Sequence, residues 1–164
     1  DRDTFGVVIL AKNANIHDRF CRMLRERQLE KTYLASVFGQ PPQENGQIDL
    51  PVYKVGGGSL IRVVDERGQK ALTQYRVLKR AEKTALLELH PLTGRTHQLR
   101  LHCMASGFPI LGDPQYTSPE STAYSAAHGL FTQQLCAARL VFPHPMTGER
   151  MEILSKQEVF FPKD

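Results

Sequence analysis

Short apolar segments, separated by glycine, proline and other turn-forming residues, run along the sequence and limit how long its regular elements can be. The longest uninterrupted apolar run covers only residues 7–11, whereas a membrane-spanning helix needs roughly 20 such residues. Alternating or short β-branched apolar runs are typical of strands. Such runs predict strands at residues 5–11, 32–38, 60–64, 72–78, 84–89, 134–142 and 151–154.

Two longer segments carry apolar residues at helical spacing instead. Residues 16–29 follow the candidate helix caps Asn13 and Asn15. Residues 96–106 are followed by Gly107 and then by a proline, as is common where helices end. Turn-forming residues predict loops at 41–46, 51–59, 65–68, 80–83 and 112–114, and a small-residue loop with one short helix at 117–129.

The order of these elements is strand, helix, several strands, helix and strands, which is typical of the α+β class. A chain of 164 residues matches the size of one domain with a substantial core. Hydrophobic residues make up 41% and charged residues 23% of the chain, which argues against a disordered, collagen-like or repeat protein. We therefore expect residues 1–164 to form a single domain, with a mixed, mostly antiparallel β-sheet flanked by a few helices.

Charge and cysteine content narrow the partners and the compartment. Lysine and arginine number 21 against 17 aspartate and glutamate, a net charge of +4, and this mild basic excess is compatible with a nucleic-acid partner. Cys21, Cys103 and Cys136 are far apart and form no C-x-x-C motif, so neither a disulfide framework nor a zinc knuckle is indicated. No secretion leader opens the sequence. We expect a reducing, cytoplasmic location and no membrane partner.

The sequence contains none of the common cofactor or metal motifs. The glycines at 56–58 are not followed by the Lys-Ser/Thr of a phosphate-binding loop, and neither G-x-S-x-G nor H-E-x-x-H occurs. His97 and His102 are five residues apart, on different helix faces, without an evident third ligand. We expect no cofactor and no metal site.

One five-residue pattern occurs twice, each time just after a predicted strand. The sequence HPLTG at 90–94 is echoed by HPMTG at 144–148. Proline fixes φ, glycine permits a positive φ and threonine can bond the local backbone, so both copies predict a turn. The first copy continues as RTHQ at 95–98 and the second as ERM at 149–151. We expect any chemistry to depend on these different continuations.

Several polar residues are suited to chemistry, and each also has a purely structural interpretation. Asp1 is either a frayed terminus or a nucleophile or base at a sheet edge. Arg95, at the start of the helix predicted at 96–106, is either solvated or a ligand for a carboxylate or phosphate; because its charge opposes the helix dipole, an acidic partner is favoured. Tyr33 is either half-buried packing or a stacking surface for an extruded base. A stripe of arginines at helical spacing fits either a solvated face or phosphate contacts: Arg19, Arg22 and Arg25.

Five stretches, in order along nearly the whole chain, match the motifs of one known family. Residues 1–6 (DRDTFG) match the second half of HRLDxxTSG, and residues 31–35 (KTYLA) match KxYxA. Residues 70–75 (KALTQY) are similar to KxAxTxY, residues 90–116 are similar to HxxTGRTHQIRxH…GDxxY, and residues 135–145 resemble the closing strand LHAxxLxFxHP. The chain thus resembles the RluA-type pseudouridine synthases.

This resemblance implies the pseudouridine synthase fold and the isomerisation of specific uridines in structured RNA, either rRNA or tRNA, without a cofactor. The N1–C1′ bond of a flipped-out uridine breaks, the uracil rotates, and C5 bonds to C1′. The family's essential aspartate falls on Asp1, as nucleophile or as base, its active-site tyrosine on Tyr33, and the arginine that pairs with the aspartate on Arg95. Substrate contacts are expected from six further residues: Lys31, Arg19, Arg22, Arg25, Thr96 and Leu99.

Two features depart from the family pattern. The His-Arg-Leu expected before Asp1 is absent, as is an S4-like RNA-binding domain, so we expect an N-terminally truncated catalytic domain, acting as a monomer. Phe5 stands where the family usually has serine. Two alternatives stay open: a non-catalytic RNA-binding or assembly module on the same fold, and a small cytosolic protein in which Asp1 and Arg95 form a structural ion pair.

Overall fold

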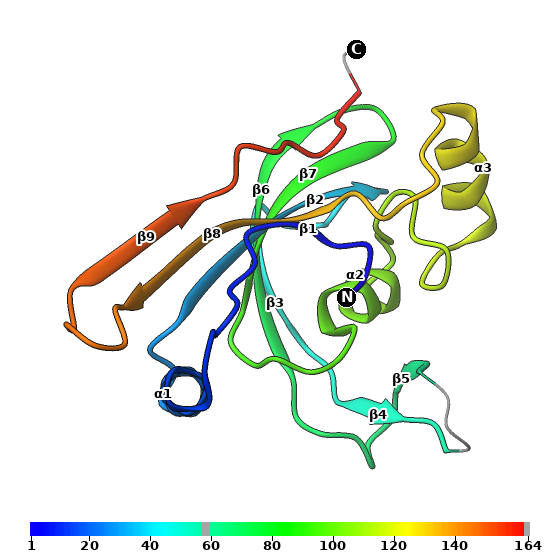
Figure 1. Cartoon of the computed structure of the whole chain (residues 1–164). Helices are drawn as coiled ribbons and strands as arrows, with labels where there is room; N and C mark the ends of the chain where they lie inside the picture. Colours follow the sequence, from blue (N-terminus) through cyan, green and yellow to red (C-terminus); the bar gives the residue numbers. More distant parts are fainter. Residues whose placement is uncertain (57–59, 163–164) are drawn as a thin grey trace.

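The computed structural model describes residues 1–56 and 60–162 and has the expected α+β architecture, with a large sheet, a small sheet and helices around them (Figure 1). The described helices are α1 (Ala14–Arg25), α2 (Gln98–Ala105) and α3 (Pro119–Ala127). The described strands are β1 (Phe5–Gly6), β2 (Glu30–Phe38), β3 (Asn45–Asp49), β4 (Val52–Lys54), β5 (Arg62–Val64), β6 (Leu72–Arg80), β7 (Thr84–Pro91), β8 (Leu135–Pro143) and β9 (Arg150–Leu154).

The large sheet is mixed because one of its strand pairs is parallel. Its strands follow the order β1-β8-β2-β7-β6-β3, and β9 pairs with β8 as well. β1 runs parallel to β8, while the other pairings described in this sheet are antiparallel. The expectation of a mixed, mostly antiparallel sheet is confirmed. β4 and β5 form the small antiparallel sheet.

The hydrophobic core lies between α2 and one face of the large sheet. Leu99 of α2 packs in one cluster with alternate residues of β2 and β7, among them Ala35 and Leu87. Tyr33 pairs with Leu89 in the register of β2 and β7 and packs against the same cluster. Because side chains alternate between the faces of a strand, Tyr33 lies at the end of the buried row that faces α2.

Helix α1 is capped as its sequence predicts and is fixed beside the β8–β9 hairpin (Figure 1). The side chain of Asn13, rather than Asn15, caps the helix, because its Oδ1 accepts a hydrogen bond from Ile16 N at 3.0 Å. The ring of Phe20 contacts that of Phe142 in β8, with centroids 5.4 Å apart. Two arginines lie in the last turn, where positive charge is favourable to the helix dipole.

The first strand is much shorter than the buried strand expected at residues 5–11. β1 covers only Phe5–Gly6, and the side chains of Val8 and Leu10 are exposed. Gly6 has a φ of +104°, and a Cβ at this position would collide with the backbone of Ala137 in β8. The chain therefore approaches β8 closely at a left-handed glycine, and the extended pairing ends there.

Two strands form where the sequence predicts loops. Residues 45–49, expected within a turn-rich segment, form β3 and pair with β6. In the loop expected at 51–59, Val52–Lys54 form β4 and pair with β5, while residues 57–59 lie outside the described residues. Both corrections add short strands at the sheet margins, where cross-strand pairing outweighs weak local propensity.

The helix boundaries shift by a few residues. α2 begins at Gln98 and not at residue 96, because His97 has a left-handed backbone with a φ of 58° and precedes the helix as its cap. α3 is the short helix expected within residues 117–129. In the part of the chain that the structure describes, no helix is long and apolar enough to cross a membrane.

Candidate active site

Most of the site residues suggested by the sequence line one pocket. The pocket has a volume of about 320 Å³ and lies where the start of the chain, β2 and the N-terminal end of α2 meet. His97 and Gln98, which the sequence analysis did not assign to the site, also line it. The sequence-predicted residues in its wall are Asp1, Lys31, Tyr33, Arg95, Thr96 and Leu99.

The turn leading into β1 holds Asp1 in this pocket. Thr4 N donates a hydrogen bond to Asp1 O at 3.3 Å. The buried Gln133, just before β8, donates from Nε2 to Thr4 Oγ1 at 2.6 Å. The Asp1 side chain is 18% exposed, so neighbouring charges act on its carboxylate through a medium less polar than bulk water.

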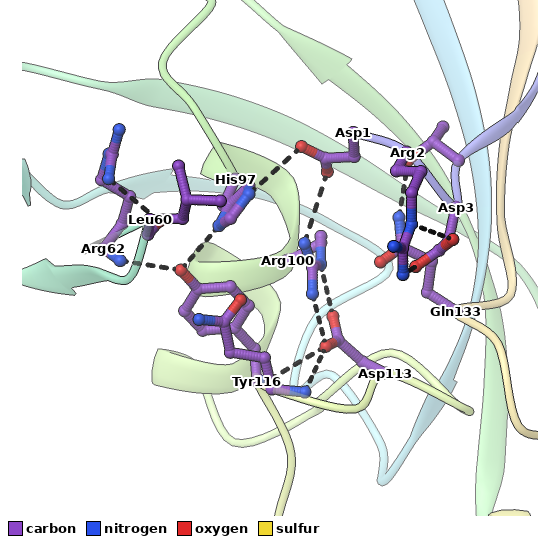
Figure 2. A network of polar contacts seen from close by, with 12 residues as sticks. Asp1, Arg2, Asp3, Leu60, Arg62, His97, Arg100, Asp113, Tyr116 and Gln133 are labelled. Carbon is purple, nitrogen blue, oxygen red and sulfur yellow. Dashed lines mark hydrogen bonds and ion pairs between the residues drawn. The ribbon is translucent and has the colours of Figure 1, made fainter. Parts of the chain in front are cut away.

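The ion pairs of Asp1 differ from the sequence-based expectation. Asp1 Oδ1 lies 3.7 Å from His97 Nε2, and Oδ2 lies 3.8 Å from Arg100 Nη1 (Figure 2). The expected pair with Arg95 is wrong for the described structure, since Arg95 Nε donates to Lys70 O at 3.2 Å. Because α2 begins late, Arg95 lies in the preceding loop, whereas His97 and Arg100 are three residues apart and share the helix face toward Asp1.

A buried ion pair with Asp113 fixes Arg100 (Figure 2). Arg100 Nε and Nη2 donate to the two Asp113 carboxylate oxygens at 2.7 and 2.8 Å, and the two side chains are 7% and 0% exposed. Asp113 Oδ1 also accepts from the backbone N–H groups of Gln115 and Tyr116, each at 2.9 Å. Such a bidentate, fully hydrogen-bonded pair is rigid, and it leaves Arg100 Nη1 directed toward Asp1.

Gln98 shapes the loop that carries Arg95. Its Oε1 accepts from Thr93 Oγ1 at 2.7 Å and from Arg95 N at 3.0 Å. Its Nε2 donates to Leu72 O at 3.1 Å and to Thr73 Oγ1 at 3.0 Å. The amide of this buried side chain thus uses its full hydrogen-bonding capacity, and it ties the loop before α2 to the beginning of β6.

Tyr33 and Lys31 both line the pocket. Within residues 1–56 and 60–162, neither Tyr33 Oη nor Lys31 Nζ makes a hydrogen bond or an ion pair. Burial raises the pKa of Tyr33 and lowers the pKa of Lys31. The phenol therefore stays protonated at neutral pH. Among the described residues the partly buried Lys31 ammonium has no ion pair, and because an unpaired buried charge is costly, an anionic ligand here would be favourable.

A second, larger pocket of about 640 Å³ adjoins the first. It extends from the shared wall toward the C-terminal end of α1 and toward β8. Its lining includes one carboxylate, Glu30, against five lysine or arginine side chains: Arg25, Arg27, Lys31, Arg95 and Arg139. The residues that line both pockets are Lys31, Pro91, Thr93, Gly94 and Arg95.

The three arginines of the α1 stripe have different surroundings. Arg25 lines the larger pocket. Arg19 Nη1 donates to Pro145 O at 2.7 Å, so its guanidinium binds the β8–β9 turn. Arg22 is exposed and lines neither pocket. The structure therefore places only Arg25 of this stripe next to the other candidate site residues.

His102, the second histidine considered as a metal ligand, uses both ring nitrogens in hydrogen bonds within the protein. Its Nδ1 lies 2.9 Å from Thr73 Oγ1 and its Nε2 lies 2.9 Å from Leu50 O. Among residues 1–56 and 60–162, no group of three or more His, Cys, Asp and Glu side chains is arranged to hold a metal ion.

The sequence analysis did not identify the residues that face the carboxylate of Asp1, or the residues that hold them. They all belong to the matched segment 90–116, but a motif does not show which helix face meets which partner. One signal was available: Arg100 stands between Leu99 and Leu101 on a helix with a buried apolar face. A buried arginine needs an acidic partner. The residues concerned are His97 and Arg100, which face Asp1, and their own partners Tyr116 and Asp113.

Comparisons with known proteins show the family to which the chain belongs. The family model described as RNA pseudouridylate synthase matches residues 1–105. The chain is 39% identical over 148 residues to the dual-specificity RNA pseudouridine synthase RluA of Yersinia pestis, covering 89% of this chain and 72% of that protein. It is 35% identical over 153 residues to the ribosomal large subunit pseudouridine synthase C of Vibrio vulnificus, covering 93% of this chain and 48% of that protein.

Solved structures show the same fold. Human RNA pseudouridylate synthase domain containing 1 aligns with a TM-score of 0.81 and 27% identity, covering 96% of this chain and 66% of that one. Human RNA pseudouridylate synthase domain containing 4 aligns with a TM-score of 0.74 and 29% identity, covering 95% and 68%. The chain spans about half the length of several curated relatives, such as the Vibrio vulnificus protein. In sequence motifs, family match and fold, the chain belongs to the RNA pseudouridylate synthase family, with RluA-type relatives.

Proposed function

We propose that this chain isomerises uridine to pseudouridine within RNA. The observation that carries the proposal is the pocket that combines a carboxylate, a phenol, a guanidinium and an ammonium group, from Asp1, Tyr33, Arg95 and Lys31. The chain belongs to a family whose curated relatives are named for this reaction. The comparisons give no support to a non-catalytic module on the same fold.

Asp1 is the residue proposed to react with the ribose. Its carboxylate either attacks C1′ or removes the proton from C2′, and in both routes the N1–C1′ bond breaks with its electron pair moving to the uracil. After the base has rotated, C5 bonds to C1′; in the covalent route this displaces the Asp1 carboxylate, and in the other route the protonated Asp1 returns its proton to C2′. The C5 proton then leaves and N1 takes up a proton, so that the product is an isomer of the substrate. Both routes need an ionised carboxylate, and the guanidinium of Arg100 lies 3.8 Å from its Oδ2.

Tyr33 is proposed to pack against the flipped uracil. Its ring borders both the apolar core and the pocket, so a base in the pocket has an aromatic surface beside it. Because burial keeps the phenol protonated, stacking and hydrogen-bond donation agree better with this environment than removal of the C5 proton by a phenolate. The pocket volume lies within the range of small-ligand sites, about 300–1,000 Å³.

The larger pocket is proposed to hold the RNA backbone next to the target nucleotide. A flipped nucleotide stays joined to its neighbours through phosphates, so the groove that receives them must begin at the wall of the base pocket. Lys31 and Arg95 stand on that shared wall, and Arg25, Arg27 and Arg139 continue the positive lining. The RNA class, rRNA or tRNA, the monomeric state, and the role of residues 1–164 as the catalytic domain are part of the same proposal.

Replacing Asp1 tests the chemistry. We expect Asp1→Asn to abolish turnover, because an amide is neither a nucleophile nor a base here, while RNA binding is largely kept. Release of tritium from RNA with C5-labelled uridine measures turnover, and filter binding measures affinity. Asp3→Asn is the matched control, since Asp3 pairs with the exposed Arg2 at 3.1 Å and lies outside the pocket.

The outcomes separate the hypotheses. Tritium release by wild type and by Asp3→Asn, but not by Asp1→Asn, supports the proposed reaction. Salt-dependent binding of RNA by the wild type without tritium release would instead favour a non-catalytic module. Turnover by Asp1→Asn would show that Asp1 is not the reacting carboxylate. Assays on rRNA and tRNA in parallel then identify the substrate class.

A further inference from the structure

Tyr116 links His97 to the small sheet through two hydrogen bonds (Figure 2). Its phenol oxygen lies 2.9 Å from His97 Nδ1 and 2.9 Å from the backbone nitrogen of Arg62 in β5. A backbone N–H can only donate, so the phenol oxygen accepts the bond from Arg62. The phenol proton is then available for His97 Nδ1, which lies within hydrogen-bond distance.

This arrangement determines which nitrogen of His97 carries the proton. Burial lowers the pKa of His97, and the positive charge of Arg100 lowers it further, so the imidazole is neutral at neutral pH and has one N–H. If that proton were on Nδ1, the hydroxyl of the buried Tyr116 would lose its acceptor among the described residues, which is unfavourable. The proton is therefore assigned to Nε2.

The protonated nitrogen of His97 faces the carboxylate of Asp1. His97 Nε2 lies 3.7 Å from Oδ1, while Arg100 Nη1 lies 3.8 Å from Oδ2. One carboxylate oxygen thus faces a neutral donor and the other faces a cation. His97 also has a φ of 58°, a left-handed conformation that is uncommon for residues other than glycine and that recurs at functional sites.

We propose that His97 is a positioning residue for Asp1: its Nε2–H, oriented by the Tyr116 hydroxyl, holds one carboxylate oxygen so that the other is presented to the ribose. The inference rests on the proposed function and adds to it a residue that orients Asp1. The separation of 3.7 Å is longer than a hydrogen bond, and contacts of this kind shorten when substrate fills an active site. In this proposal Arg100 places a positive charge near the carboxylate, and His97 fixes the orientation of the carboxylate.

Kinetics of two His97 variants test the role. His97→Phe keeps an aromatic ring but removes the donor, and we expect kcat to fall about 100-fold with an unchanged KM for RNA, because a small misplacement of the reacting group has that effect. His97→Gln places an amide N–H near the position of Nε2, and we expect it to restore most of the lost kcat. His128→Phe is the matched control, because His128 stacks on Tyr124 beside α3 and lies outside both pockets.

The tautomer can be observed directly by ¹⁵N NMR of the imidazole nitrogens, without RNA. We expect His97 to be protonated on Nε2 in the wild type. Tyr116→Phe removes the donor to Nδ1, so we expect the second tautomer to become populated and kcat to decrease. Tyr124→Phe, the matched control on α3, is expected to leave the His97 signals unchanged.

Three results would overturn the positioning role: wild-type kcat in His97→Phe, failure of His97→Gln to recover any activity, or a wild-type proton on Nδ1. Circular dichroism shows whether His97→Phe has folded, and if it has not, His97→Gln and the wild-type tautomer decide. A wild-type protein that forms no pseudouridine refutes the proposed function itself. An active wild type with an equally active, folded His97→Phe refutes only this inference.

Discussion

The turn at residues 90–94 and the turn at residues 144–148 share four of their five residues; the first begins within the last two residues of β7, and the second directly follows β8. In the first turn, Thr93 Oγ1 accepts from Leu72 N at 2.9 Å and donates to Gln98 at 2.7 Å. In the second, the bonds of Thr147 Oγ1 go to its own neighbours, His144 and Glu149. The threonine of the first turn thus bonds β6 and α2, whereas the threonine of the second bonds only residues of its own turn and the next residue.

This difference shows how a common turn sequence acquires a functional position. The second turn only closes the β8–β9 hairpin, with Gly148 N donating to His144 O at 2.9 Å. The first turn must stand at a fixed place between a strand and a helix, because the residues after it line the base pocket. The hydrogen bonds of Thr93 and Gln98 hold the first turn in that position. The pattern HPxTG therefore encodes the turn, and the residues outside it encode the site.

The largest expected contrast concerns the first arginine after each turn. We expect Arg95→Ala to lower kcat/KM by about 100-fold, as the loss of one electrostatic group from an active site commonly does. Arg95 lines both pockets. Arg150 pairs with the exposed Glu152 at 3.1 Å, and Arg150→Ala is expected to leave turnover unchanged. Tritium release assays on the two purified variants measure the contrast.

Equal turnover by Arg95→Ala and Arg150→Ala would show that the residue after the first turn is no more important for activity than the one after the second. Because Arg95 makes no ion pair with Asp1 in the described structure, we expect a large part of the loss in KM, with the remainder in kcat. A loss confined to kcat would indicate that Arg95 moves to Asp1 when RNA binds. The split between the two constants therefore sharpens the assignment of Arg95 to RNA contact.

The next contrast concerns the two threonines. Thr93→Ala removes the acceptor of Leu72 N and a donor to the buried Gln98, so we expect the free energy of unfolding to fall by about 1–3 kcal/mol. Thr147→Ala affects exposed local bonds, and we expect a change within about 0.5 kcal/mol. Urea denaturation measures both values. Similar losses of unfolding free energy in the two variants would show that the bonds of Thr93 to β6 and α2 add no more stability than the local bonds of Thr147.

The sequence could predict much of the site because its motifs include the residues that line the pocket. It could not predict the partner of Asp1, since this depends on the residue at which α2 begins. A left-handed backbone at His97 moves the helix start past Arg95 and turns Arg100 toward the carboxylate. The conformation of a single non-glycine residue is set by tertiary contacts, which periodicity and capping rules do not include.

The fold was predictable to a similar degree. Alternation identified β2, and short apolar runs identified β6, β7 and β8. These patterns failed for β3, where Asn45 and Gly46 indicated a turn. Gly46 lies directly over the ring of Tyr75, which leaves no space for a larger side chain. The glycine thus serves close packing in a strand, and a turn propensity scale cannot distinguish that use from a bend.

A smaller effect is expected from pH, through His102 beneath the first turn. His102 bonds Thr73, which also accepts from Gln98. Burial lowers the pKa of His102 from 6.5, outweighing the opposite effects of Leu50 O and of the Asp49 charge. The unfolded chain therefore binds a proton first as the pH falls below about 6.5. We expect the free energy of unfolding to decrease from that pH downward, until the folded-state pKa is passed.

His102→Gln removes this titration and is the variant that tests it. Its free energy of unfolding is expected to be lower than that of the wild type at neutral pH, because buried hydrogen bonds are lost. Between neutral and mildly acidic pH it should decline less than the wild-type value. Urea denaturation at a series of pH values measures both slopes. Identical slopes would show that His102 does not couple folding to protonation.

The smallest expected contrast concerns the two glycines, and here the second turn is expected to lose more stability than the first. Gly148 has a φ of +77° with open space around it, so Gly148→Ala is expected to cost about 1 kcal/mol, from the left-handed backbone alone. Gly94 has no such φ, and a Cβ there would make an ordinary contact, 3.6 Å from Lys31 Nζ. Gly94→Ala is expected to change the free energy of unfolding by less than about 0.5 kcal/mol. Thermal and urea denaturation would show the second turn as the more sensitive to this change, although it is the less sensitive to loss of its threonine. A larger cost at Gly94 than at Gly148 would mean that the first turn depends on backbone freedom as well as on its bonds to β6 and α2.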